Sequence, residues 1–364
     1  HCQCSQCVHP HSHQRTFDSL DVATAQNHVE EHTLSEGNQD IQILWASDSP
    51  GTKDMCRRSF FSAAWLRQQC YTNTERETRL ANEATCLRRA WSPEQLLERC
   101  SGGIPTVEYA ALMCSDEEDA GLKSLLTNLY SHGIVFVNNC PLSMDETENI
   151  VKRFGTPRYT PTWGTMWDTA PAEKPQDTAY TNIALLPHVD CCYLEDQVGF
   201  QVFNCVDAAA KNGGASVWVD GFKVAENMRA NHPEAYDYFC TVSLPYFCVT
   251  DDAHVRSEGR IFEQGHDGMI RRVKFNNYDR APLNSLTSKE IDQFYEHLPV
   301  LYNAFRDPKN ILQHTLHVGQ MVIIDNWRVL HGREEFQGYR NLRGCYVGRD
   351  DVWSKMRLYG IANT

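Results

Sequence analysis

The sequence has no long apolar run, no internal repeat and no low-complexity segment. No stretch approaches the roughly 18–20 apolar residues that a membrane-spanning helix needs. Positive charge is also outnumbered, since 34 Lys and Arg against 47 Asp and Glu give a formal net charge of −13. Nucleic acids and anionic membrane surfaces attract basic patches, so this balance disfavours both as partners. We therefore expect a globular protein with neither a nucleic-acid nor a membrane partner.

The sequence also lacks the cysteine pattern of a small disulfide-rich scaffold. Its 15 cysteines are an odd number and are scattered over 364 residues. Such usage suits a reducing compartment, and we expect the cytoplasm or the mitochondrial matrix. The apolar fraction of 41%, with 8 Trp, 15 Tyr and 15 Phe, suffices for a core. The length predicts one large domain with a smaller one.

A change in pattern near Ser101-Gly102-Gly103 predicts the domain boundary. The chain before it contains a start rich in Cys and His, a strand-like run at 41–45 and a helix that begins at Ser92-Pro93. Serine at the cap, proline at the first helical position and glutamine three residues after the cap are a helix-start signal. We place the two domains at residues 1–102 and 103–364.

The second part reads as mainly β with some α. An amphipathic helix from about residue 116 leads into a buried strand at 133–137, and Ser143 caps a further helix. After residue 180, short β-rich runs alternate with glycine and polar turns, which is typical of a sandwich or jelly roll rather than a parallel α/β sheet. These runs lie at 198–205, 215–219, 242–249, 270–275, 320–325 and 343–347.

A His-x-Asp pair follows the β-like run at 179–185. In an extended strand, residues i and i+2 point to the same face, so His188 and Asp190 can face one metal ion. Two histidines and one carboxylate form the facial triad that non-haem Fe(II) oxygenases use. The pair alone is a weak signal, because the chain has 15 His and a second string of this kind, His28-Val29-Glu30. We interpret that second string as exposed and not metal-binding.

The apolar strand that ends at His331-Gly332 supplies the second histidine. Nine residues later comes Arg340, which can form a bidentate pair with the far carboxylate of 2-oxoglutarate. Ser216, after Gly213-Gly214, could share that carboxylate. For each residue alone, a core histidine or a surface ion pair is the simpler interpretation. Together and in this order they favour an Fe(II) and 2-oxoglutarate dependent oxygenase.

Long strings in the last third resemble the family of trimethyllysine and γ-butyrobetaine dioxygenases. The resemblance covers nearly the whole chain, and Asn276-Asn-Tyr-Asp-Arg280 favours the trimethyllysine branch. It implies a double-stranded β-helix (jelly roll), a small N-terminal zinc-binding domain and a homodimer. It also implies the iron ligands His188, Asp190 and His331 and the cosubstrate residue Arg340. The strings that carry it are Phe275–Arg280, Asp325–Glu334, Gly338–Tyr346 and Arg349–Asp351.

The resemblance further implies a substrate site. Trp163, Trp167 and Tyr180 would form an aromatic cage, with Asp177 and Asn276 as polar contacts. A trimethylammonium group cannot donate a hydrogen bond, so ring faces must recognise it through cation–π attraction. Each ring taken alone is more simply an ordinary core residue.

The start of the chain matches the zinc ligands of the butyrobetaine branch. Three thiolates at Cys2, Cys4 and Cys7 can bind zinc once a fourth ligand completes a tetrahedron. That branch uses a histidine some forty residues later, where this chain has Cys56. We therefore predict a structural zinc site with four cysteine ligands. The alternatives are a ligand from His9, His11 or His13, and free cysteines in a tail.

The expected reaction is hydroxylation of N6,N6,N6-trimethyllysine at carbon 3, the first step of carnitine biosynthesis. Its cofactors would be Fe(II), 2-oxoglutarate and a structural zinc, with ascorbate as an accessory reductant. Trp163, Cys191-Cys192 and Arg343 depart from the family pattern. The same class could therefore hydroxylate, desaturate or cyclise γ-butyrobetaine or another amino acid. A non-catalytic, zinc-containing interaction protein is the third hypothesis, and the intact triad argues against it.

Overall fold

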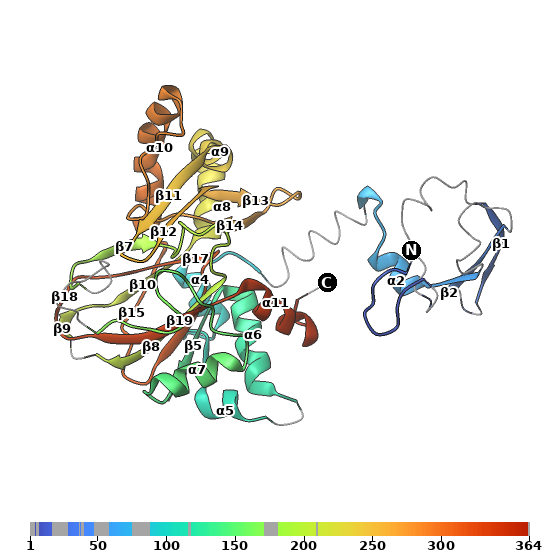
Figure 1. Cartoon of the computed structure of the whole chain (residues 1–364), viewed down its shortest axis with the longest axis horizontal. Coiled ribbons are helices and arrows are strands. Elements are labelled where there is room, and N and C mark those ends of the chain that lie inside the picture. The colour runs from blue at the N-terminus through green and yellow to red at the C-terminus, as the bar shows by residue number, and fades with distance from the viewer. Residues whose placement is uncertain are drawn as a thin grey trace. The chain divides into compact units, whose positions relative to one another are not determined.

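The computed structural model divides the chain into two compact units, His1–Asn82 and Glu83–Thr364 (Figure 1). The division falls before the expected boundary at residue 102, so the helix capped by Ser92 belongs to the second unit. The structure describes residues 4, 7–16, 28–35, 37, 40–46, 58–74, 88–115, 118–170, 181–208 and 210–362.

Unit 1 contains a three-stranded antiparallel sheet in the order β1-β2-β3. Its strands are β1 (Val29–Leu34), β2 (Asp40–Trp45) and β3 (Arg58–Ser62), and β3 runs directly into α2 (Ala63–Gln68). Ser62 caps this helix, because its side chain accepts a hydrogen bond from the Trp65 N–H. The strand predicted at 41–45 is confirmed as most of β2.

Unit 2 is a mixed α and β fold with two main sheets. The larger sheet is antiparallel except where β4 meets β5, and the smaller one is fully antiparallel. The larger sheet has the order β4 (Thr106–Glu108), β5 (Ile134–Asn138), β16 (Met321–Asp325), β8 (Phe200–Asp207), β19 (Asn341–Val347) and β6 (Trp167–Asp168). The smaller has β15 (Ile311–His314), β10 (Ser216–Asp220), β17 (Val329–Arg333) and β7 (Leu185–His188).

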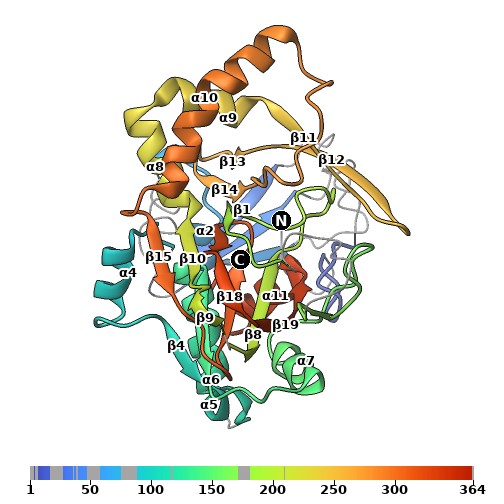
Figure 2. The ribbon, with the colours of Figure 1, turned by 90° about the vertical axis from the view of Figure 1, so that its left-hand side faces the viewer.

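Three short strand pairs and eight helices complete the described part of unit 2. Helices α8, α9 and α10 gather at one end of the sheets and α5, α6 and α7 at the other (Figure 2). No described helix combines the length and apolarity needed to cross a membrane. The pairs are β11 (Ser243–Val249) with β12 (His254–Arg260), β13 (Phe262–Gln264) with β14 (Ile270–Val273), and β9 (Ala210–Gly213) with β18 (Phe336–Gly338). The helices are α4 (Pro93–Arg99), α5 (Tyr109–Met113), α6 (Ala120–His132), α7 (Met144–Lys152), α8 (Gly221–Asn231), α9 (Pro233–Thr241), α10 (Ser288–Arg306) and α11 (Arg349–Leu358).

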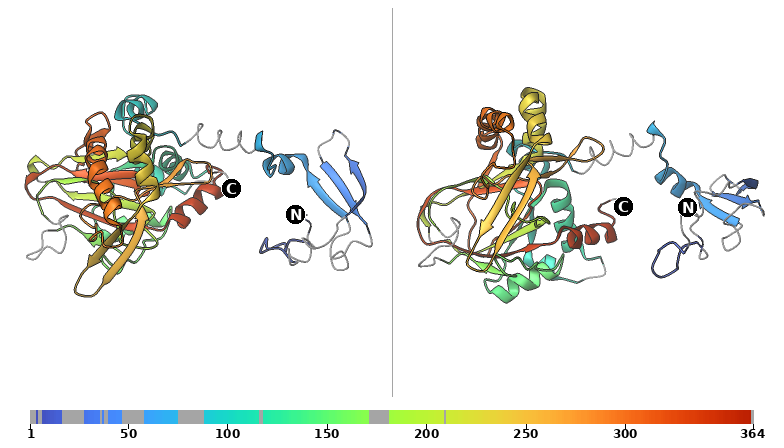
Figure 3. Two further views of the ribbon diagram at one scale, coloured as in Figure 1. Left: turned by 90° about the horizontal axis from the view of Figure 1, so that it is seen from above. Right: turned by 45° about the horizontal axis from the view of Figure 1, so that its top comes forward.

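The larger sheet is covered on both faces, which explains the unbroken apolar run of β16. Both views of Figure 3 show the yellow and orange helices α8, α9 and α10 side by side. Met321 and Ile323 pack with the leucines of α6, whereas Val322 and Ile324 belong to the core on the other face. The same alternation in β8 sends Phe200 and Val202 toward α6. Residue 201 therefore points to the opposite face, on which the candidate site lies.

Two features of unit 2 differ from expectation. Of the β-like run at 179–185, the described residues 181–184 are not in a strand; β7 begins at Leu185 and includes His188. Residues 171–180 lie outside the described ranges. Helices α8, α9 and α10 were not predicted among the β-runs. A local signal existed for α10, because Thr287 and Glu290 form a complete capping box at its start.

A buried ion pair ties the core of unit 2 together. Arg328 donates to both carboxylate oxygens of Asp220, at 3.1 and 2.8 Å, and both side chains are fully buried. We predict that Asp220→Asn lowers the free energy of unfolding by about 3–5 kcal/mol, because it leaves a buried guanidinium without its counter-charge. Urea denaturation measures this. Glu148→Gln, which breaks an exposed pair with Lys152 at 2.7 Å, is the control and should cost less than about 1 kcal/mol.

His132, at the end of α6, makes stability depend on pH. Burial, aided by the charge of Arg328, lowers the pKa of His132 to about 4. Between its ordinary pKa of about 6.5 and this value, the unfolded chain binds a proton that the folded chain does not. The free energy of unfolding therefore decreases as pH falls through this window. We expect His132→Leu to lose less stability than the parent between pH 7.5 and pH 5 in urea titrations, and equal losses would contradict this.

Candidate metal centre and substrate pocket

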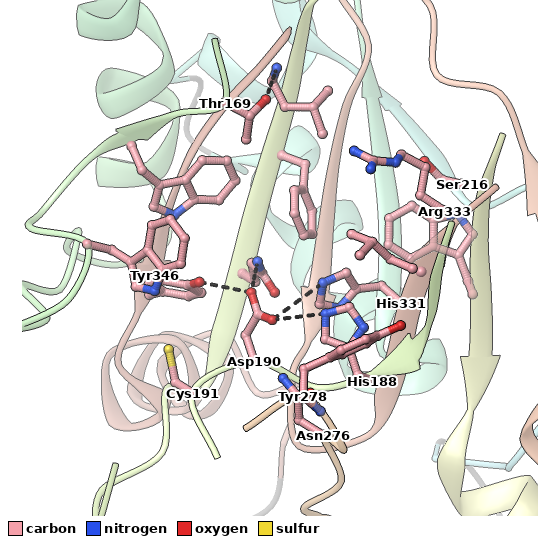
Figure 4. Close-up of a pocket in the computed structure, with 18 of the residues that line it drawn as sticks. Thr169, His188, Asp190, Cys191, Ser216, Asn276, Tyr278, His331, Arg333 and Tyr346 are labelled. Carbon is pink, nitrogen blue, oxygen red and sulfur yellow. Dashed lines mark hydrogen bonds and ion pairs between the residues drawn. The ribbon is translucent and has the colours of Figure 1, made fainter. Parts of the chain in front are cut away.

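His188, Asp190 and His331 converge in unit 2. One ligand atom from each lies within 4.8 Å of the others, and this is the only such cluster among the described residues. His188 and His331 stand opposite each other in the β7–β17 pair, with ring centroids 4.4 Å apart. Figure 4 shows Asp190 facing both imidazoles. Asp190 Oδ1 lies 3.3 Å from His188 Nε2 and 3.7 Å from His331 Nε2.

The donor set fits a divalent metal such as iron. His188 Nδ1 lies 2.7 Å from the Leu186 carbonyl oxygen, and donation to that oxygen leaves Nε2 as the free lone pair. Burial lowers the pKa of His331 to about 3, with His188 acting in the same direction, so this imidazole is neutral. Burial opposes ionisation of Asp190, but the neighbouring imidazoles and the Tyr346 hydroxyl hold its pKa well below the usual range. Burial opposes protonation of His188, but the Asp190 carboxylate raises its pKa, so metal binding there would compete with a proton. Two imidazoles and a carboxylate are the triad that Fe(II) oxygenases use.

The chain turns sharply directly after Asp190. Cys191 has φ +58°, a left-handed conformation that is uncommon outside glycine. The Asp190 main chain is held on both sides, because its N–H donates to Asn326 Oδ1 at 2.9 Å and its carbonyl accepts from Gln197 Nε2 at 3.1 Å. The carboxylate is therefore held beside β7 by the turn and by two buried amides.

Arg340 and Ser216 meet at the other end of the same pocket. Arg340 Nη2 donates to Ser216 Oγ at 3.2 Å, and both residues line the pocket that contains the triad. Arg333 also lines it and was not predicted. It donates to the carbonyls of Thr181 and Ile183 at 2.6 and 2.9 Å. Its position two residues after His331 in a strand was an available signal.

Two of the three predicted cage residues line the pocket, namely Trp163 and Trp167. Trp167 is buried and stands edge-on to Phe203, with ring centroids 5.5 Å apart. Gly344 makes room for it, since a Cβ at 344 would lie 2.6 Å from the indole. Tyr180, the third, lies outside the described residues, as does the predicted polar contact Asp177.

A tyrosine that was not predicted holds the Trp163 ring. Trp163 Nε1 donates to Tyr193 Oη at 3.0 Å, and the Cys191 thiol donates to the same oxygen at 3.7 Å. Thr162 Oγ1 lies 3.1 Å from it. Trp163 and Cys191, which both differ from the family pattern, therefore donate hydrogen bonds to the same Tyr193 hydroxyl in the pocket wall.

Asn276, the other predicted polar contact, lines the pocket, but its amide is engaged within its own turn. Its Oδ1 accepts from the Tyr278 N–H and its Nδ2 donates to Asp279 Oδ2, both at 2.9 Å. Tyr278 and Asp279 line the pocket too, in the string that carried the resemblance. Arg343 lies elsewhere, paired with Asp168 at 2.9 Å, so this departure does not line the pocket.

The predicted zinc ligands are only partly described. Cys7 is buried, and its N–H donates to the Cys4 carbonyl at 3.0 Å in a tight turn. Cys2 and Cys56 lie outside the described residues, so the zinc site with four cysteine ligands remains a prediction. The alternative ligand His9 accepts at Nδ1 from the Ser12 N–H at 3.2 Å. The second His-x-acid string, His28-Val29-Glu30, is exposed.

Known proteins match both the sequence and the fold. Trimethyllysine dioxygenase of Homo sapiens is 31% identical over 368 residues, which cover 99% of this chain and 81% of the relative. An asparagine oxygenase structure, 15% identical, matches with a TM-score of 0.51 over 74% of this chain and 88% of its own. A taurine dioxygenase from Burkholderia xenovorans, 14% identical, matches with a TM-score of 0.50 over 65% and 84%. These two structures support the fold alone.

Fold, sequence and site together define a non-haem Fe(II) and 2-oxoglutarate dependent dioxygenase. The resemblance drawn from the C-terminal strings is confirmed by the match to a trimethyllysine dioxygenase over nearly the whole chain. The chain belongs to the family described as taurine catabolism dioxygenase TauD, TfdA family. The model of this family matches residues 98–346.

Proposed function

We propose that this chain hydroxylates N6,N6,N6-trimethyllysine at carbon 3, with His188, Asp190 and His331 as its iron ligands. The observation that carries the proposal is one pocket lined by the triad, by Arg340 with Ser216, and by Trp163 and Trp167. A relative of 31% identity that bears the name trimethyllysine dioxygenase supports the same substrate.

Each part of the pocket has a task in this proposal. Arg340 and Ser216 bind the far carboxylate of 2-oxoglutarate and so direct its keto-acid end toward the triad. The faces of Trp163 and Trp167 take the trimethylammonium, which has no N–H to donate to a hydrogen-bond acceptor. Tyr193 keeps the Trp163 face in position through its hydrogen bond to the indole N–H. Asp177, Tyr180 and Asn276 complete the substrate site.

When bound, Fe(II) with 2-oxoglutarate and dioxygen supplies the oxidant that replaces one C–H hydrogen by hydroxyl, with succinate and CO2 as co-products. The contribution of the protein is position. His188, Asp190 and His331 would hold the metal, and Arg340 would fix the cosubstrate. The aromatic faces then set which carbon of the bound amino acid comes nearest the metal.

A succinate-release assay tests the substrate. We expect the largest yield with trimethyllysine, compared with γ-butyrobetaine, unmodified lysine and other free amino acids. An absence of turnover of trimethyllysine would refute the proposal. The Cys191–Tyr193–Trp163 contacts favour one alternative, an oxygenase of the same class for another amino acid or betaine. Turnover of such a compound in place of trimethyllysine would support it.

We extend the proposal to the larger features implied by the resemblance. The two main sheets would form a double-stranded β-helix, and Cys2, Cys4, Cys7 and Cys56 would hold a structural zinc. The turn at Cys4–Cys7 supports the zinc site. Metal analysis should find zinc that is lost in Cys7→Ser. We also expect a homodimer, stimulation by ascorbate and a mitochondrial matrix location, since the human relative is named as mitochondrial.

A further inference from the structure

The two oxygens of the Asp190 carboxylate have different surroundings. Oδ1 faces His188 and His331, at 3.3 and 3.7 Å from their Nε2 atoms. Oδ2 accepts two hydrogen bonds, from Gln201 Nε2 at 2.6 Å and from Tyr346 Oη at 2.8 Å. Figure 4 shows the Tyr346 hydroxyl approaching the carboxylate from the side opposite the histidines. One oxygen is thus directed at the metal position and the other is held by donors.

The fold itself places the two donors. Gln201 on β8 and Tyr346 on β19 are direct partners in the antiparallel register, so their side chains leave the same face of the larger sheet. Both are almost fully buried, at 1% and 3% exposure. The flanking residues Phe200 and Val202 pack on the far face against α6. Neither side chain can therefore move to the other face of the sheet without disrupting a strand that is buried on both faces.

The chemistry of the amide fixes its orientation. An ionised carboxylate only accepts hydrogen bonds, so the nitrogen of Gln201 and not its oxygen must face Asp190. Gln201 Oε1 is buried and has no hydrogen-bond partner in the described part of the chain. Burying an amide oxygen unsatisfied is unfavourable, and such groups in native proteins call for a functional explanation. Holding Asp190 supplies one.

We propose that Gln201 and Tyr346 are positioning residues that hold the Asp190 carboxylate with Oδ1 directed at the metal position. A carboxylate free to rotate would spend part of its time with neither oxygen in that position, so it would bind the metal more weakly. The hydrogen-bonding pair prevents this rotation, and the buried amides on the Asp190 main chain keep the residue from moving as a whole. This inference rests on the iron ligands of the proposed function but not on its substrate.

The test measures Fe(II) affinity of the full-length apoprotein under anaerobic conditions, by competition with a chelator. Gln201→Met and Tyr346→Phe remove one donor each with little change of volume. Each should weaken Fe(II) binding about 10–100-fold, which is the usual effect of losing a group that orients a metal ligand. Tyr246→Phe is the matched control. Its buried hydroxyl donates to the Lys274 carbonyl at 2.7 Å, away from the pocket, and its loss should leave Fe(II) affinity unchanged.

A double-mutant cycle separates positioning from general loss of structure. Ni(II) is the probe, since it binds such sites more tightly than iron and leaves binding measurable after a ligand is lost. In an Asp190→Ala background, Tyr346→Phe should have no further effect on Ni(II) affinity, because the carboxylate through which it acts is absent. An equal loss in both backgrounds would overturn the inference, as would wild-type Fe(II) affinity in both single variants. If the parent protein itself failed to bind Fe(II), the iron ligands would be wrong instead.

Discussion

Replacing His331 with alanine should reduce 2-oxoglutarate turnover by at least about 1,000-fold, because the metal contributes several kcal/mol to the reaction. His331 lies within β17, opposite His188, and its neutral imidazole would be the third ligand of the metal. Without it, only His188 and Asp190 remain. Succinate formation measures the activity, and Fe(II) affinity of the apoprotein should fall in parallel.

The control is another histidine of the same sheet. His314 ends β15, and its Nε2 lies 2.8 Å from Gln320 Oε1. It does not line the pocket, so His314→Ala should keep its Fe(II) affinity even where it costs some stability. If His331→Ala bound Fe(II) and released succinate like the parent protein, the ligand assignment would be wrong.

Replacing Arg340 with lysine should raise the KM for 2-oxoglutarate roughly 100-fold, because a hydrogen bond to a charged group contributes about 1.5–3 kcal/mol. A guanidinium can form two parallel hydrogen bonds to the far carboxylate, whereas an ammonium can only act as a point charge. Steady-state kinetics with varied 2-oxoglutarate measures the change. Fe(II) affinity without cosubstrate should stay constant, which separates this effect from damage to the triad.

Arg343→Lys is the matched control for Arg340→Lys. Arg343 lies three residues further along and pairs with Asp168 at 2.9 Å, outside the pocket. Its replacement should leave the KM for 2-oxoglutarate near the parent value. If the two variants changed that KM equally, or if Arg340→Lys left it unchanged, another group would have to bind the cosubstrate.

Local sequence predicted much of the strand content because buried strands leave local traces. The runs at 133–137 and 320–325 coincide closely with β5 and β16, whose side chains alternate between two cores. The order of the sheet could not be predicted in the same way. β16 lies between β5 and β8, although more than a hundred residues separate it from either. Such pairings depend on contacts between distant segments, which periodicity does not record.

In the candidate site, too, some residues could be predicted from local sequence and others depend on contacts between distant segments. His188, Asp190, His331 and Arg340 stand in recognisable strings, and the structure brings them into one pocket. Gln201 is a polar residue in an apolar run, a signal that was available, but its partner Tyr346 is defined only by the register of β8 and β19. Tyr193 is likewise identified only by its contact with the indole of Trp163, 30 positions earlier in the chain.

The most direct test is a crystal structure of the full chain with Mn(II), the 2-oxoglutarate analogue N-oxalylglycine and trimethyllysine. We predict metal density bound by His188, Asp190 Oδ1 and His331, with the analogue carboxylate on Arg340. The trimethylammonium should lie against the faces of Trp163 and Trp167. A metal held by other residues, or a trimethyllysine bound outside this pocket, would contradict the proposed function.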